Sequence, residues 1–105
     1  MKMTVYSTHG IPAEIEGKDI GLEVGGKRFI VHKNPFYFCP KWTVTETSTG
    51  FAVCSRDTKT KAIEEARLIL DKRSAEQMEE VCAKALKKLT DMNLLAPGKV
   101  MRDAE

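Results

Sequence analysis

The first half of the chain alternates apolar and polar residues with the period of two that is typical of half-buried β-strands. In residues 20–24 the apolar side chains occupy every second position, and the dipeptide Gly25-Gly26 follows them. Because glycine tolerates positive φ angles, this dipeptide predicts a two-residue hairpin turn. Residues 27–33 then return as the partner strand, with Phe29 and Val31 directed toward the core.

A second hairpin is predicted a short distance further along the chain. Trp42 and Val44 alternate with threonines, residues 48–50 can form the turn, and Phe51 and Val53 lie on the returning strand. Two other segments have weaker patterns. Residues 4–8 form a short β-prone run, and residues 36–39 lie between prolines, which favours an edge strand or an ordered loop.

The second half of the chain has the spacing of helices. Apolar residues recur at helical intervals over about 58–71 and again over about 75–93. Between these stretches, Ser74 and Gln77 match the capping box that begins a helix. A single helix across both would be about 54 Å long at 1.5 Å per residue, too long for a small globule to cover. We therefore predict two helices and a short tail over 97–105.

Together these elements predict an α+β fold. An antiparallel sheet of four to five strands, built on two hairpins over about 4–55, precedes two C-terminal helices packed on one face. The length of 105 residues and the 42% hydrophobic content indicate one domain over residues 1–105 with its own core. No secretory signal or transmembrane stretch is recognisable, so we expect a small soluble protein in the cytoplasm.

The three cysteines do not predict a disulfide framework or a zinc ribbon, because their number is odd and no two have C-x-x-C spacing. Buried, unreactive thiols are the simpler interpretation. A site built from His32, Cys39 and Cys54 across neighbouring strands is the alternative. We expect no cofactor and no metal.

Charge changes the picture in one window. The chain carries 17 Lys and Arg against 15 Asp and Glu, but no acid lies between Glu23 and Glu46. That window contains four strong bases and five of the seven aromatic residues. Cations along a backbone and aromatic rings beneath the bases are how proteins hold single-stranded nucleic acid. Alternatively, the aromatic residues belong to the core and the bases protect a sheet edge from aggregation. The candidate binding residues are Lys27, Arg28, His32, Lys33, Tyr37, Lys41, Trp42, Lys59 and Lys61.

The segment from Trp42 to Leu70 resembles the closing β-β-α unit of several families. The shared pattern is Trp42-x-Val44, then Gly50-Phe51-x-Val53, then Lys59-Thr60-Lys61-Ala62 opening a helix. Double-stranded-RNA-binding domains, the arm-site DNA-binding domains of phage-type integrases and the HicB-like antitoxins contain such units. The resemblance implies that Lys59 and Lys61 contact phosphates at the helix start. The paired glycines and lysine cluster of double-stranded-RNA binders are missing, and Asp57 lies beside the expected phosphate site.

We do not expect an enzyme. His9 and His32 have no neighbouring nucleophile pattern, and no catalytic motif such as G-x-S-x-G or H-E-x-x-H occurs. The leading hypothesis is therefore nucleic-acid binding. The alternative is a protein-binding adaptor or inhibitor, of the phage or mobile-element accessory type, that acts through an exposed aromatic edge. In that case the apolar stripe of the second helix, with Leu86, Leu89 and Met92, would form a homodimer interface.

Overall fold

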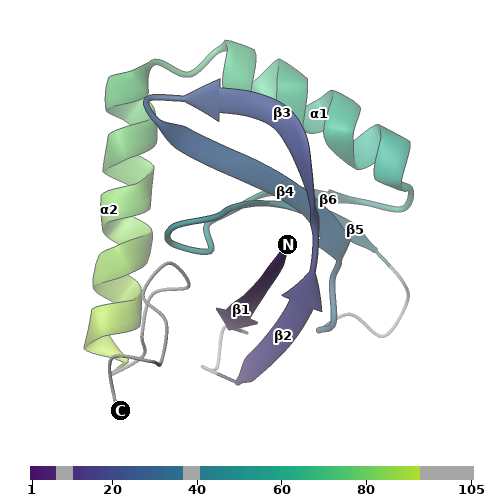
Figure 1. Cartoon of the computed structure of the whole chain (residues 1–105). Coiled ribbons are helices and arrows are strands. Elements are labelled where there is room, and N and C mark those ends of the chain that lie inside the picture. The colour runs from purple at the N-terminus through teal and green to yellow at the C-terminus, as the bar shows by residue number, and fades with distance from the viewer. Residues whose placement is uncertain (7–10, 37–40, 93–105) are drawn as a thin grey trace.

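A computed structural model describes residues 1–6, 11–36 and 41–92, which form six antiparallel strands followed by two helices (Figure 1). The predicted α+β class, antiparallel sheet and two C-terminal helices are confirmed. Strands β3 to β6 form a four-stranded sheet in chain order, and β1 and β2 form a separate two-stranded sheet, the N-terminal ribbon. The elements are β1 (Lys2–Tyr6), β2 (Pro12–Glu16), β3 (Lys18–Val24), β4 (Lys27–Lys33), β5 (Trp42–Glu46), β6 (Ala52–Arg56), α1 (Lys59–Asp71) and α2 (Ala75–Asp91).

Both predicted hairpins are present, and their turns depend on glycine. Gly25 and Gly26 have φ angles of 58° and 79° between β3 and β4, and Gly50 has a φ of 78° before β6. These angles lie in the left-handed region that side chains with a Cβ rarely adopt. Gly25 has a second role, because a Cβ there would lie only 3.0 Å from the Cβ of Ala75. The first turn of α2 therefore lies directly beside the β3–β4 turn.

The main core lies between the sheet and the two helices. Phe29, Val31 and Val44 project from the sheet and are at most 2% exposed, as the alternation predicts. Helix α1 crosses this face and buries three residues, Ala62, Ala66 and Leu70. Helix α2 stands at the end of the sheet where the two hairpin turns lie, and only its first half, through Met78 and Cys82, enters the main core (Figure 1). The two helices therefore cover the sheet unequally.

The opposite face of the sheet is covered by the N-terminal ribbon (Figure 1). Met3 and Val5 of β1 and Ile15 of β2 pack around Ile30 of β4, which is fully buried. Gly17 joins the ribbon to β3, and a Cβ on it would lie 2.5 Å from Cδ1 of Ile30. Ile30 is thus the residue where the second cluster meets the sheet.

Strand β2 is the element that the sequence analysis missed. Three carboxylates close together, those of Glu14, Glu16 and Asp19, are typical of a polar loop, but the structure places them in β2 and β3. The strand begins with proline and contains two glutamates among its five residues, a composition that is also typical of a loop. Its alternation is nevertheless regular, since Ile15 is buried while Glu14 and Glu16 are exposed.

A buried polar layer lies on the ribbon side of the sheet. His32 is on the outer face of β4, as expected, yet only 2% of it is exposed. Its Nδ1 lies 2.9 Å from the carbonyl oxygen of Lys33, and its Nε2 lies 2.7 Å from Oγ1 of Thr45. Because a carbonyl only accepts, Nδ1 carries the proton and Nε2 accepts from the hydroxyl. In the same layer Thr43 accepts from Asn34 at 3.0 Å and bonds Ser55 at 2.8 Å.

The helix boundaries follow from their caps. Oγ1 of Thr58 accepts from the backbone N–H of Lys61, and Ser74 and Gln77 form the predicted capping box. Helix α2 ends at Asp91, and the predicted last residue, Asn93, lies outside the described residues, as does the predicted tail over 97–105. The predicted edge element over 36–39 also falls mostly outside them. Neither helix in the described part of the chain is long and apolar enough to span a membrane.

The burial of His32 predicts a pH dependence of stability. Burial lowers the pKa of His32 below its ordinary value of 6.5. This effect outweighs that of the hydrogen bond to the carbonyl of Lys33, which raises the pKa. Between pH 6.5 and the lower pKa of the folded protein, the unfolded chain therefore binds more protons than the folded chain. The free energy of unfolding should thus fall as the pH falls through that window. One proton gives at most about 1.4 kcal/mol per pH unit.

Urea unfolding between pH 7.5 and 5.5 measures this slope. We expect His32→Gln to remove the decline. An equal slope in His32→Gln and the wild type would contradict the assignment.

Candidate functional site

Four of the candidate residues meet where β4 ends, β5 begins and α1 begins. Lys33, the last residue of β4, pairs directly with Trp42, the first residue of β5. The Nζ of Lys33 lies 5.7 Å from the centroid of the Trp42 ring, and the Nζ of Lys59, the first residue of α1, lies 5.8 Å from it. Both separations are within the range of cation–π attraction. Lys41 precedes Trp42 in the chain, and we call these four residues the Trp42 cluster.

The start of α1 concentrates positive charge next to the Trp42 cluster. Lys59 and Lys61 both lie in the first turn of α1, which contains no acidic residue. A helix N-terminus already carries a partial positive charge, so two lysines there are electrostatically unfavourable by a few tenths of a kcal/mol each. Such an arrangement favours an anion at this position more strongly than the lysines alone would.

Acidic side chains limit this positive surface on two sides. Asp57 forms an ion pair of 3.4 Å with Lys41, and Glu65 forms one of 2.9 Å with Arg56. A shallow hollow between Lys33 and Trp42 is lined on its other side by Glu14 and Glu16 of the ribbon. The face that remains positive therefore runs from Lys33 across Trp42 to the first turn of α1.

The other candidate residues do not join the Trp42 cluster. Lys27 lies at the far end of β4, with its Nζ 4.0 Å from Oε2 of Glu79 on α2. Arg28 projects from the face of β4 opposite to that of Lys27. It forms ion pairs with Asp19 at 2.9 Å and with Glu23 at 3.8 Å. His32 is buried under the ribbon, and Tyr37 lies outside the described residues. The acid-free window of the sequence is thus partly neutralised by acids from β3 and α2.

Trp42 itself is half-buried and packs partly against the main core. The half-buried ring helps to anchor the end of β5, and two ammonium groups lie within 6 Å of its centroid.

A second surface, which the sequence analysis foresaw only as an apolar stripe, is a groove along the second half of α2. It has a volume of about 390 Å³ and lies between α2, the β5–β6 turn and β1. Tyr6 comes from β1 and Phe51 from the turn. The lining residues of α2 are Val81, Lys84, Ala85, Lys88 and Leu89, and Met92 is the C-cap of this helix. We call it the α2 groove.

The three residues expected to form a dimer interface are divided by this groove. Leu89, which is 9% exposed, and Met92, which is half-buried, line it. Leu86 is 37% exposed and is not among the lining residues. The stripe of α2 is therefore two surfaces, a groove wall and a separate exposed leucine.

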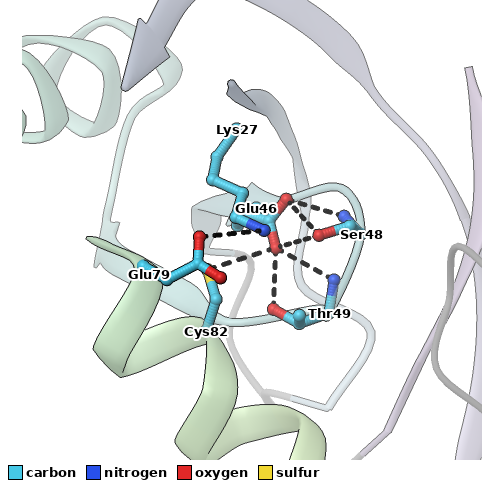
Figure 2. Close-up of polar contacts among 6 residues, drawn as sticks. All are labelled: Lys27, Glu46, Ser48, Thr49, Glu79 and Cys82. Carbon is cyan, nitrogen blue, oxygen red and sulfur yellow. Dashed lines mark hydrogen bonds and ion pairs between the residues drawn. The ribbon is translucent and has the colours of Figure 1, made fainter. Parts of the chain in front are cut away.

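A buried carboxylate fixes the turn that forms one wall of the α2 groove. Glu46, the last residue of β5, is fully buried, and Figure 2 shows the groups that surround it. Its Oε2 accepts from the backbone N–H of Ser48 at 2.7 Å, and its Oε1 accepts from the N–H and hydroxyl of Thr49 at 2.9 and 2.7 Å. The thiol of Cys82 on α2 donates to Oε1 at 3.5 Å. One side chain thus holds strand, turn and helix together.

These contacts determine the ionisation of both partners. Burial alone would raise the pKa of Glu46, but the hydrogen bonds from Ser48 and Thr49 outweigh it and hold the pKa below its ordinary value of 4.5. Burial and the adjacent carboxylate raise the pKa of Cys82 to about 11, so its thiol stays protonated at neutral pH.

Cys82 therefore agrees with the simpler interpretation of a buried thiol, whereas Cys54 is only half-buried. Burial also raises the pKa of Cys54, whose thiol donates to the carbonyl of Ala62. In the alternative metal site, both ring nitrogens of His32 already have partners, and Cys39 lies outside the described residues. Within residues 1–6, 11–36 and 41–92, no group of three or more His, Cys, Asp or Glu is placed to hold a metal ion.

Replacement of the Glu46 carboxylate should destabilise the protein strongly. Glu46→Gln removes the charge and points an amide N–H₂ toward donors, so we expect the free energy of unfolding at pH 7 to fall by about 2–3 kcal/mol. The matched control is Glu14→Gln on the exposed face of β2, which should stay within about 0.5 kcal/mol of the wild type. Urea unfolding measures both, and equal effects of the two variants would contradict the anchoring role of Glu46.

Comparison of the chain with protein-family models, with curated proteins and with solved structures finds no match. The function therefore has to be argued from the surfaces themselves.

Proposed function

We propose that the protein binds nucleic acid at the Trp42 cluster and the first turn of α1. The observation that supports this most directly is the approach of two lysines from different elements to one accessible tryptophan. Lys33 and Lys59 are far apart in the sequence, yet both ammonium groups lie within 6 Å of the Trp42 ring. The binding region is narrower than the sequence suggested, since it excludes Lys27, Arg28 and His32.

Charge supports a phosphate backbone as the ligand. Lys33, Lys41, Lys59 and Lys61 supply four positive charges. Asp57 is paired with Lys41, and Glu14 and Glu16 border the hollow beside Lys33 and Trp42. The N–H groups of the first turn of α1 add a partial positive charge in the same place. A phosphate there would relieve the mutual repulsion of the lysines and exchange a weak surface ion pair for a stronger one.

The tryptophan supports a single strand over a duplex. An aromatic face contributes roughly 1–3 kcal/mol for each base that stacks on it, and any base can do so. The bases of a duplex are already stacked on each other and do not offer their faces to Trp42. The protein therefore binds a short stretch of single-stranded DNA or RNA, with phosphates on the lysines and one base against the ring.

Fluorescence anisotropy with a fluorescein-labelled 20-nucleotide strand tests this proposal. If three to four phosphates are contacted, affinity should fall about 20- to 50-fold between 50 and 200 mM NaCl, because bound counterions are released. Trp42 is the only tryptophan of the chain, so stacking should also quench the intrinsic fluorescence. A 20-base-pair duplex should bind more weakly and quench less.

Matched charge reversals separate the site from net charge. Lys33→Glu/Lys59→Glu should abolish binding, and the fold should persist because an acid at the start of α1 suits the helix dipole. The control Lys72→Glu/Lys87→Glu changes the net charge by the same amount, at the exposed C-cap of α1 and at an exposed position of α2. It should bind nucleic acid like the wild type once salt is raised. Equal losses in both variants, or no binding at 50 mM NaCl, would disprove the proposal.

A further inference from the structure

The α2 groove lies apart from the surface proposed to bind nucleic acid. It is bounded by the β5–β6 turn, whereas the Trp42 cluster is at the other end of β5. With about 3.3 Å per residue, the length of β5 separates the two surfaces by at least about 13 Å. A ligand in the groove therefore need not touch a strand bound at Trp42.

The floor of the groove is apolar surface that the chain leaves incompletely buried. Tyr6, Ala85 and Met92 are only half-buried and belong to neither of the two core clusters of the described residues. Val81, Ala85, Leu89 and Met92 follow one another at steps of four, four and three, so they form one continuous face of α2. At 1.5 Å per residue this face is about 16 Å long, which is the length of three helical turns.

The rim of the groove is positive. Lys84 and Lys88 lie along one wall, and none of the lining residues in the described part of the chain is acidic. The Nζ of Lys84 also lies 3.4 Å from Oε1 of Glu80. This i,i+4 ion pair is exposed and contributes little to stability. At the turn, the guanidinium of Arg73 lies 5.8 Å from the ring of Phe51. The ligand that matches this surface has apolar anchors at helical spacing and acidic residues beside them.

The positive rim also argues against the two other occupants. In a symmetric dimer through this face, Lys84 and Lys88 of one copy would meet the same lysines of the other, because an isologous contact places like patches together. The chain's own residues 93–105 offer apolar side chains, but their two acids, Asp103 and Glu105, are balanced by Lys99 and Arg102.

We propose that the α2 groove binds a short, acidic, amphipathic segment of another protein, of about ten residues, in the helix-in-groove mode. The apolar anchors of that segment lie against Val81, Ala85 and Leu89, and its acids lie beside Lys84 and Lys88. This inference is independent of nucleic-acid binding and deepens the adaptor hypothesis from the sequence.

Selection of a random 12-residue peptide library, displayed on phage, against the full chain tests the proposal. We expect enrichment of peptides that combine leucine or phenylalanine at i, i+3 or i+4 spacing with Asp or Glu. Titration of the enriched peptides as synthetic, fluorescein-labelled probes then measures affinity. Lys84→Glu/Lys88→Glu should weaken binding at least tenfold, and Ala85→Asp should abolish it.

Two controls keep the result specific. Lys33→Glu/Lys59→Glu should bind the peptides like the wild type, because those residues lie at the other end of the sheet. If Ala85→Asp fails to fold, the exposed pair Lys84→Glu/Lys88→Glu still decides the outcome.

Four results would overturn the proposal. The first two are a failure to enrich any peptide and the enrichment of peptides without acids. The third is a dimer in sedimentation that Ala85→Asp dissociates. The fourth is a gain of tenfold or more in peptide affinity in Leu94→Asp/Leu95→Asp, which would show that the chain's own C-terminal residues occupy the groove.

Discussion

The carboxylate of Glu46 is the group on which the arrangement of the other elements depends. An ionised side chain without exposure to water is costly unless its oxygens are fully hydrogen-bonded. Here the backbone and hydroxyl groups of Ser48 and Thr49 and the thiol of Cys82 meet that requirement. The turn after β5 can therefore close in only one way, and α2 must lie where its cysteine reaches the same oxygen. The carboxylate of Glu46 thereby holds the β5–β6 turn in the position where it forms one wall of the α2 groove.

The sheet connects two surfaces of different chemistry. One end gathers the ends of three strands and the start of α1 around Trp42, and it is positive and aromatic. The other end presents an apolar trough beside α2, with lysines only at its rim. A rigid strand of five residues, β5, contributes to both. Together the two proposals describe an adaptor that would hold a nucleic-acid strand at one end and a protein segment at the other.

Local signals in the sequence were sufficient for most of the fold. The glycine turn at Gly25-Gly26, the glycine at position 50 and the capping box at Ser74 each act within a few residues, so each can be recognised without the rest of the chain. Strand β2 escaped recognition because its evidence is not local. Pro12 and two glutamates suit a loop equally well, and only the pairing with β1 identifies the strand.

The candidate site was less predictable, for the same physical reason. The sequence indicated which lysines and aromatic residues were available, but ion pairs depend on the register of strands and the packing of helices. Arg28 meets Asp19 and Glu23 because β3 and β4 pair in one particular register. Lys59 reaches Trp42 only because α1 begins beside the first residue of β5. Neither contact could be read from spacing along the chain.

The N-terminal ribbon gives the molecule an unequal distribution of local stability. It is attached through a small cluster around Ile30 and through Gly17, while the layer next to it consists of hydroxyls, an amide and an imidazole that water can solvate. Lifting the ribbon exposes a smaller apolar cluster than unfolding of the main core does, so we expect this sub-global opening to cost less free energy. Amide hydrogens of β1 and β2 should therefore exchange with solvent sooner than those of β4 and β5, as expected for two cooperative units of unequal stability.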